Sequence, residues 1–429
     1  MKVDKVRRVA IVGGNRIPFA RSNTAYSNFS NQQMLTATLQ GLVERFNLKG
    51  ELLGEVVGGA VMKHARDFNL IRETVLDSGL HKNTPAYDVQ QACGTGLEAA
   101  ILVANKIALG QIDSGIACGV DTTSDAPIGL NENQRQLLLQ LNRCKTPQEQ
   151  LKVGMKLLNP KNFVPAIPKN GEPRTGMSMG EHTEVMAKEW GLTREEQDEL
   201  AAKSHNNLAA AYERGFFNDL ITPFGGLECD NNMRPGSTPE AMAKLKPAFD
   251  KENGTLTAAN SSTLTDGASA VLMCSEEWAK EKGLEVLAYM TFADTAAVDF
   301  YDEDVEGLLL APAYAIPRML DRAGYSLQDF DFYEIHEAFA GVVLSTLKAW
   351  EDPKFCKERL GRDKALGKID RSKLNVNGSS IATGHPFAAT GGRIVASLAK
   401  MLHEKGSGKG LISICAAGGQ GVVAILEAA

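Results

Sequence analysis

The 429-residue chain has no long hydrophobic run. No stretch reaches the ~18 consecutive apolar residues that indicate a membrane-spanning helix. The first eight residues are basic, but they lead directly into the strand-like run Val9 to Val12, without the apolar core or cleavage site of a signal peptide. We therefore expect no integral membrane segment, and a location in the cytoplasm or, in a eukaryote, an organelle matrix.

Closely paired cysteines and a dinucleotide-binding loop are also missing. The chain has seven cysteines, none with Cys-x-x-Cys spacing, so we expect free thiols in a reducing compartment and no bound metal. The strand-like residues 9–14 do not continue into Gly-x-Gly-x-x-Gly, which argues against a dinucleotide fold. The net charge of −6 argues against a nucleic-acid partner.

What the chain does contain is a regular alternation of apolar strands and helices. The length favours about three domains at ~150 residues each, and the alternation predicts layered α/β halves. The order of small-residue turn, helix and strand occurs twice, after residue 93 and after residue 385. The predicted strands are 9–12, 56–61, 86–89, 115–120, 268–274, 286–293, 330–335, 411–415 and 422–426. The predicted helices are 34–46, 97–109, 180–190, 193–214, 311–323, 338–349 and 394–403.

The composition changes between residues 128 and 254. Asn, Gln, Lys and Pro become frequent there, and four prolines fall between Asn159 and Arg174. The helix expected at 193–214 starts with a capping box, formed by Thr193 and Glu196. We interpret this region as an inserted loop domain laid over a core, and residues 351–371 as a charged, loop-like segment.

Four short stretches rich in Gly and Ala carry reactive side chains. Cys93 lies in Gln-Gln-Ala-Cys-Gly-Thr-Gly and His336 in Glu-Ile-His-Glu-Ala-Phe-Ala. His385 lies in Thr-Gly-His-Pro-Phe-Ala-Ala-Thr-Gly and Cys415 in Cys-Ala-Ala-Gly-Gly-Gln-Gly. Small neighbours let backbone N–H groups and a substrate come close. One cysteine could attack, the other could move a proton, and the histidines could activate and stabilise, which is the equipment of acyl transfer through a thioester.

Together and in this order, the four stretches resemble the thiolase family over nearly the whole chain. The stretch Lys-Pro-Ala-Phe ending at Phe249, the run Gly254 to Ser262 and Asp-Gly-Ala at 266–268 add to the resemblance. It implies two similar βαβαβαββ halves in a five-layer α/β/α/β/α core with an inserted loop domain. The implied domains are 1–127, continued at 255–284, for the N-terminal half, 128–254 for the loop and CoA-binding domain, and 285–429 for the C-terminal half.

The resemblance also implies a role for each reactive residue. Cys93 would be the nucleophile that holds the acyl group, and the start of the following helix would lower its thiol pKa. His385 would take the proton from Cys93. Cys415 would remove or return the proton α to the thioester. His336, where most thiolases carry Asn, would stabilise the enolate oxygen, and Glu337 would order the site.

Coenzyme A would be a substrate, with no permanently bound cofactor. The resemblance places Arg234 beside a CoA phosphate, Leu245 and Phe249 around its adenine or pantetheine, and Met179 and Phe339 along the pantetheine tunnel. Ala258 and Ser262 complete the expected CoA contacts. Ser178 stands where many relatives have His and Ala241 where many have Ser, so this chain departs from the family pattern at its CoA site.

Within the family, His336 and His-Pro-Phe-Ala-Ala resemble the fatty-acid-oxidation branch related to the trifunctional β subunit. This implies an acetyl-CoA C-acyltransferase that cleaves 3-ketoacyl-CoA, forms a homodimer or tetramer, and binds a hydratase/dehydrogenase partner chain. The alternatives are a biosynthetic acetoacetyl-CoA thiolase for short chains, a β-ketoacyl synthase, which lacks a second catalytic cysteine, and a non-catalytic lipid-binding subunit.

Overall fold

The computed structural model describes residues 6–302 and 305–429. Its strands form one mixed sheet in the order β4-β3-β5-β6-β1-β7-β10-β9-β8, and β2 pairs with β6 beside this path. The strands are β1 (Val9–Arg16), β2 (Ala20–Arg21), β3 (Glu55–Gly58), β4 (Ala86–Asp88), β5 (Ser114–Asp121), β6 (Thr265–Ser275), β7 (Ala288–Ala297), β8 (Phe332–Ile335), β9 (Lys409–Ala416) and β10 (Gln420–Ala428).

Helices pack on the outer faces of this sheet and also lie between its two halves. The longer helices are α1 (Asn31–Arg45), α2 (Leu70–Asp77), α3 (Thr95–Ala108), α4 (Glu132–Arg143), α5 (Pro147–Leu157), α6 (Met179–Glu189), α7 (Arg194–Glu213), α10 (Pro312–Ala323), α11 (Ala340–Glu351) and α14 (Ala389–Lys405). The shorter ones are α8 (Pro239–Met242), α9 (Glu276–Lys282), α12 (Pro353–Glu358) and α13 (Ser380–Thr383).

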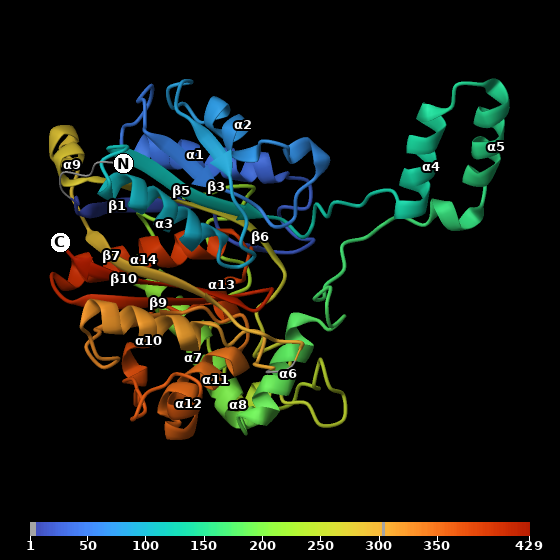
Figure 1. Cartoon of the computed structure of the whole chain (residues 1–429). Helices are drawn as coiled ribbons and strands as arrows, with labels where there is room; N and C mark the ends of the chain where they lie inside the picture. Colours follow the sequence, from blue (N-terminus) through green and yellow to red (C-terminus); the bar gives the residue numbers. More distant parts are fainter. Residues whose placement is uncertain (1–5, 303–304) are drawn as a thin grey trace.

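The two halves of the sheet lie on either side of α3 and α14, which gives five layers (Figure 1). Helices α1 and α2 cover the N-terminal half from outside, and α10 covers the C-terminal half. The alternation of side chains between the two faces of β1 explains this arrangement. Val9 and Ile11 join the central core while Ala10 and Val12 join the outer one, as the period of two of a strand requires. The predicted fold class is confirmed.

Glycines let α3 and α14 approach each other backbone to backbone in the middle layer. A Cβ at Gly391 would overlap the backbone of Gly96 and Leu97, and one at Gly96 would overlap the carbonyl oxygen of Ala388. The two helices are the ones that follow Cys93 and His385. Their close contact therefore brings two stretches that lie far apart in sequence to one place.

The strands and helices predicted in the core are confirmed, with ends shifted by a few residues. The capping box of α7 is present, since Thr193 accepts from the Glu196 N–H and Glu196 from the Thr193 N–H. Two helical segments were not predicted. Residues 132–157 of the inserted region form the helical hairpin of α4 and α5, and residues 353–358 of the segment expected to be loop-like form α12.

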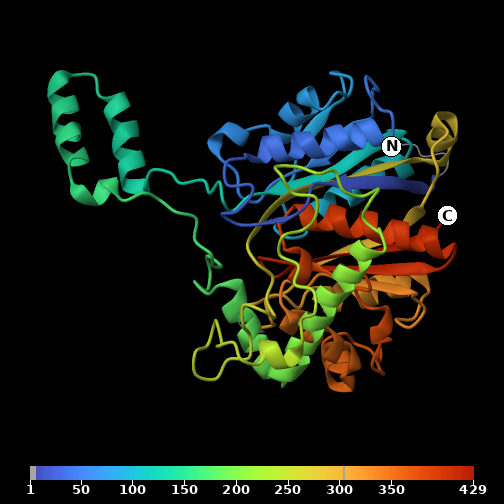
Figure 2. The same ribbon diagram turned by 180° about the vertical axis from the view of Figure 1, so that it is seen from behind.

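The hairpin of α4 and α5 stands away from the body in both views (Figures 1 and 2). None of the described residues of α4 is buried, and Val153 is the buried residue of α5. Its caps explain why it is helical. Asn131 accepts a hydrogen bond from the Gln134 N–H at the start of α4. At the start of α5, Thr146 forms a capping box with Glu149, and Pro147 occupies the first helical position.

Candidate active site

Cys93 is held on a tight turn between β4 and α3. Ala92 has φ of 46°, a left-handed conformation that costs energy for a residue other than Gly, Asn or Asp. Thr95 fixes the turn, because its hydroxyl donates to the Ala92 carbonyl at 2.7 Å and accepts from the Gln91 N–H at 2.9 Å. The turn presents the Cys93 side chain at the start of α3, half-buried in the wall of a cavity.

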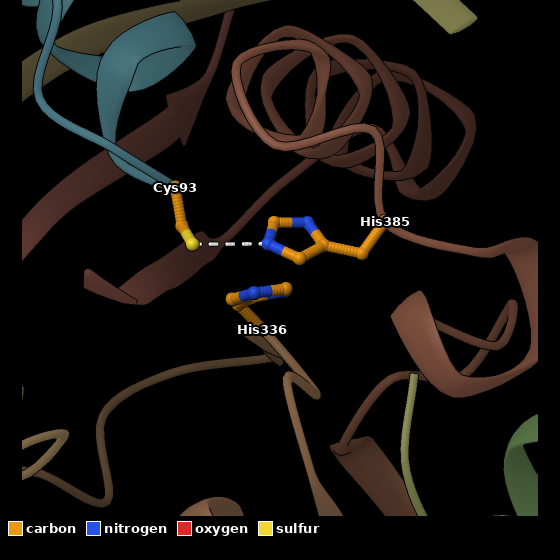
Figure 3. Close-up of side chains that lie close together, drawn as sticks. All are labelled: Cys93, His336 and His385. Carbon is orange, nitrogen blue, oxygen red and sulfur yellow. Dashed lines mark hydrogen bonds between the residues drawn. The ribbon is translucent and has the colours of Figure 1, made fainter. Parts of the chain in front are cut away.

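His385 contacts the Cys93 sulfur directly. Its Nε2 lies 3.0 Å from Cys93 Sγ, across 292 positions of the sequence (Figure 3). Its Nδ1 lies 2.6 Å from the Thr390 hydroxyl. The His385 backbone N–H donates to the hydroxyl of Thr265. A thiol within hydrogen-bonding reach of an oriented imidazole is the arrangement of an activated nucleophile.

His336 lies directly after β8, with its ring against that of His385. The two ring centroids are 4.1 Å apart, and the His336 ring lies beside the Cys93–His385 pair (Figure 3). Its Nδ1 lies 2.7 Å from the Ser380 hydroxyl. Its Nε2 is buried and has no hydrogen-bond partner among the described residues. A substrate oxygen is therefore the kind of group that this nitrogen can accommodate.

Burial sets the protonation of the cluster. Desolvation raises the pKa of the Cys93 thiol to about 12, against the lowering effect of the Ala417 backbone N–H. Burial, together with the charge of Arg393, lowers the pKa of His385 to about 3, and burial lowers that of His336 well below its ordinary value. The resting pair is thus a neutral thiol and a neutral imidazole. Burial thus shifts the Cys93 pKa in the direction opposite to the lowering expected from the start of α3.

Cys415 lies near the carboxyl end of β9 and is 3% exposed. Burial raises the pKa of its thiol, and the nearby Cys93 raises it further. The turn that follows β9 brings Ala417 and Gly418 to the same cavity as Cys93. The structure therefore gathers all four predicted catalytic residues at one end of the middle layer.

A cavity of about 610 Å³ opens in front of Cys93. Its walls come from both halves of the sheet and from the segment between α5 and α6. The walls are mainly apolar, with Val61, Met62, Leu264 and Phe387 among the lining residues. Residues 167–173 form one side, and Met179, predicted to contact CoA, also lines this cavity.

The other predicted CoA residues fall in two places. Arg234, Leu245 and Ala258 line a second pocket of about 240 Å³, together with His205. Phe249 and Phe339 do not line it but pack edge to face, with ring centroids 5.8 Å apart. The half-buried Ser262 donates its backbone N–H to the Ala338 carbonyl.

Several residues that support the site were missed in the sequence. Buried Asp121 accepts hydrogen bonds from the backbone N–H groups of Val61, Met62 and Ala388, and thereby ties two residues of the cavity wall, Val61 and Met62, to the start of α14. Ser380, Thr390 and Arg393 contact the two histidines or their partners. Their positions carry no local signal, because each matters only through contacts formed in the fold.

Glu337, expected to order the site, is buried and accepts three hydrogen bonds. The donors are the Ser204 hydroxyl, the Asn375 amide and the Ile381 backbone N–H.

Cys93, His336 and His385 offer ligand atoms within 4.8 Å of one another, a donor set of the kind that binds Zn²⁺.

None of the described helices is both long and apolar enough to cross a membrane.

The Cys93–His385 pair in this fold is suited to acyl transfer through a thioester. The family descriptions "Thiolase, N-terminal domain" and "Thiolase, C-terminal domain" match residues 9–277 and 284–428. The chain belongs to the thiolase family.

Its relatives share almost the full length. A 3-ketoacyl-CoA thiolase of Alteromonas mediterranea is 42% identical over 98% of this chain and 97% of its own. The crystal structure of the Bacillus anthracis acetyl-CoA acetyltransferase matches with a TM-score of 0.82 and 31% identity, covering 99% of this chain and 100% of that one. The crystal structure of a human mitochondrial 3-ketoacyl-CoA thiolase in complex with CoA matches with a TM-score of 0.81 and 27% identity. The match covers 99% of this chain and 98% of that one.

Proposed function

We propose that the protein is a 3-ketoacyl-CoA thiolase, an acetyl-CoA C-acyltransferase that cleaves 3-ketoacyl-CoA with CoA. The observation that carries this proposal is the 3.0 Å contact between Cys93 Sγ and His385 Nε2, beside His336 and with Cys415 at the same end of the sheet. The relatives named 3-ketoacyl-CoA thiolase support the substrate class.

In the first half of the reaction Cys93 attacks the 3-keto carbon. Its proton passes to His385 Nε2. No ion pair is broken in this step, because both groups are neutral in the resting state. The Cα–Cβ bond then breaks and leaves an acyl group on Cys93 and the enolate of acetyl-CoA. His336 stabilises the developing negative charge on oxygen. Cys415, protonated because its pKa is raised, gives the enolate its proton.

In the second half CoA releases the acyl group. The Cys415 thiolate left by the first half takes the proton from the CoA thiol. The CoA thiolate attacks the thioester carbonyl, and the Cys93 sulfur leaves and recovers its proton from His385. The cycle restores every group, so it needs no metal or redox cofactor. Run backwards, the same steps condense two acetyl-CoA molecules.

We assign CoA to the second pocket and the neighbouring aromatic pair. Arg234 would meet a phosphate, and Leu245 and Ala258 would contact the adenine or pantetheine. Phe249, Phe339, Met179 and Ser262 would guide pantetheine toward Cys93. In this proposal residues 128–254 form the loop and CoA-binding domain between the halves 1–127 and 285–429, with 255–284 continuing the first half.

The proposal extends to the surroundings of the enzyme. We place it in the cytoplasm, as a homodimer or tetramer, and in the branch related to the trifunctional β subunit. A hydratase/dehydrogenase partner chain follows from that branch. Co-expression with such a chain and size-exclusion chromatography tests this, and a single homo-oligomeric peak contradicts it.

The deciding experiment is CoA-dependent thiolysis of acetoacetyl-CoA and of a long-chain 3-ketoacyl-CoA by the pure protein. Cleavage of both, or of the long one better, supports the proposal. Cleavage of acetoacetyl-CoA alone assigns the protein to the short-chain alternative, which the likeness to the Bacillus anthracis acetyl-CoA acetyltransferase favours. Cleavage of neither, by the protein alone or with the proposed partner chain added, contradicts both functions.

A further inference from the structure

A buried arginine lies behind the two histidines. Arg393, in the second turn of α14, is 3% exposed, and its Nη2 donates to the hydroxyl oxygens of Ser380 at 3.0 Å and Ser379 at 3.3 Å. Its Nε has no hydrogen-bond partner among the described residues. Arg393 forms no ion pair among the described residues, and a buried cation without one is costly and needs a reason.

Ser380 is the link between this arginine and the active site. Its hydroxyl has one donor and two lone pairs. Arg393 can only donate, so it occupies one lone pair of the Ser380 oxygen. The other described partner of this oxygen is His336 Nδ1, at 2.7 Å. The Ser380 O–H proton can be satisfied among the described residues only if it points to that nitrogen.

We propose that Arg393 and Ser380 are positioning residues that hold His336 in the tautomer with its proton on Nε2. Nδ1 then accepts from Ser380, and the unpartnered Nε2 is an N–H donor directed at the reacting oxygen. This inference rests on the proposed function, because it explains how His336 could stabilise an enolate.

The tautomer of His336 with its proton on Nδ1 is less favourable, both in its hydrogen bonds and in its interaction with an enolate. A proton on Nδ1 would leave the Ser380 O–H without an acceptor and would turn two N–H groups toward one oxygen. It would also leave a lone pair on buried Nε2, which repels a developing enolate instead of stabilising it. His385 differs in this respect, because its Nδ1 partner Thr390 receives no hydrogen bond from any arginine that the structure describes.

The charges around Arg393 keep it cationic while leaving the histidines neutral. Burial lowers the pKa of Arg393 to about 10, so it stays charged at neutral pH. The carboxyl groups of Glu334, Glu337 and Asp230 oppose that lowering, and Arg16 adds to it. The same cation lowers the pKa values of His336 and His385. A neutral His336 ring carries one proton, so the hydrogen bond from Ser380 decides where that proton is.

The direct test is NMR of the resting protein labelled with ¹³C and ¹⁵N in its histidine rings. The His336 signal is the one missing from the spectrum of His336→Asn, and the ring shifts of a neutral histidine distinguish its two tautomers. We expect the Nε2–H form. A His336 ring protonated on Nδ1, or on both nitrogens, overturns the proposal. This readout needs no turnover, so it is independent of whether the protein is a thiolase.

Variants connect the tautomer to the reaction. Ser380→Ala should lower kcat by about tenfold, a fraction of the ~10²–10³ that loss of one oxyanion donor costs, with KM changed less than about twofold. The His336 shifts should move toward a mixture of tautomers. Ser345→Ala is the matched control, because Ser345 is equally buried and its hydroxyl has no partner among the described residues.

Arg393 gives the second variant pair. Arg393→Lys keeps a cation that can donate to Ser380 and should retain more activity than Arg393→Met. If Arg393→Met does not fold, Ser380→Ala carries the test alone. A Ser380→Ala protein with the kcat and the His336 shifts of Ser345→Ala overturns the proposal.

Discussion

The cluster around Cys93 and the hairpin of α4 and α5 differ in burial and in the range of their contacts along the sequence. In the cluster, titratable groups such as His336 and Cys415 are almost fully buried, and their partners come from distant parts of the chain. In the hairpin, apolar side chains such as Leu138, Leu151 and Met155 are exposed. The described contacts there are local caps, one helix against the other, and α4 against the adjoining turn at residues 160–163.

The difference shows which part of the molecule tolerates change. A buried polar group depends on each partner, because losing one leaves a desolvated atom without a hydrogen bond. A helix without buried residues depends on its own caps and propensities. Substitutions in the cluster should therefore have large and specific effects, whereas changes in the hairpin should stay local.

The largest effect is expected for Cys93→Ser. A serine hydroxyl is a far weaker nucleophile at neutral pH, so thiolysis and condensation should both fall by at least ~10⁴-fold. The thermal midpoint should change little, because the side chain is similar in size. Steady-state kinetics and a melting curve measure the two together, and retained turnover would remove Cys93 from the mechanism.

Cys415→Ser should slow the proton transfers in both halves of the reaction, while Cys93 still forms some acyl-enzyme. Steady-state turnover should fall by ~10²–10⁴, the usual contribution of general acid–base catalysis. Rapid quenching and mass spectrometry of the protein detect the acyl group. Full steady-state activity would contradict the assigned proton transfer.

Alkylation of Cys93 should sharpen the description of the resting pair. The pKa of its thiol is raised to about 12 and that of His385 lowered to about 3, so the thiolate fraction grows with pH throughout the neutral range. Inactivation by iodoacetamide should therefore quicken by about tenfold per pH unit between roughly pH 6 and 9. A plateau with a midpoint below neutrality would mean a thiolate–imidazolium pair instead.

The smallest effect is expected for removal of the hairpin. Replacing residues 132–157 by a short Gly-Ser linker should leave the thermal midpoint and kcat on acetoacetyl-CoA nearly unchanged, within about twofold for kcat, because α4 and α5 have little buried contact with the body. Deleting residues 167–173, which line the cavity at Cys93, is the matched comparison and should impair catalysis. A hairpin deletion that abolishes activity would contradict this division.

Much of the core could be predicted because its strands and helices have strong apolar patterns. The hairpin was missed because its helices have almost no buried face to produce such a pattern. A local signal was present in Thr146, Pro147 and Glu149, which form the start of α5, but the abundance of polar residues and prolines outweighed it. The CoA residues were gathered only in part, since Arg234, Leu245 and Ala258 share a pocket that Phe249 and Phe339 do not line.

The sequence by itself determined the α/β alternation, the reactive residue types and the small neighbours that let a substrate approach them. Only the tertiary structure decided which nitrogens carry protons and which thiols are neutral. Those properties depend on desolvation and on partners such as Thr390, Ser380 and Arg393, which meet His385 and His336 only after α14 and α13 have packed. A local motif specifies the reacting group, whereas its charge is fixed by everything that excludes water from it.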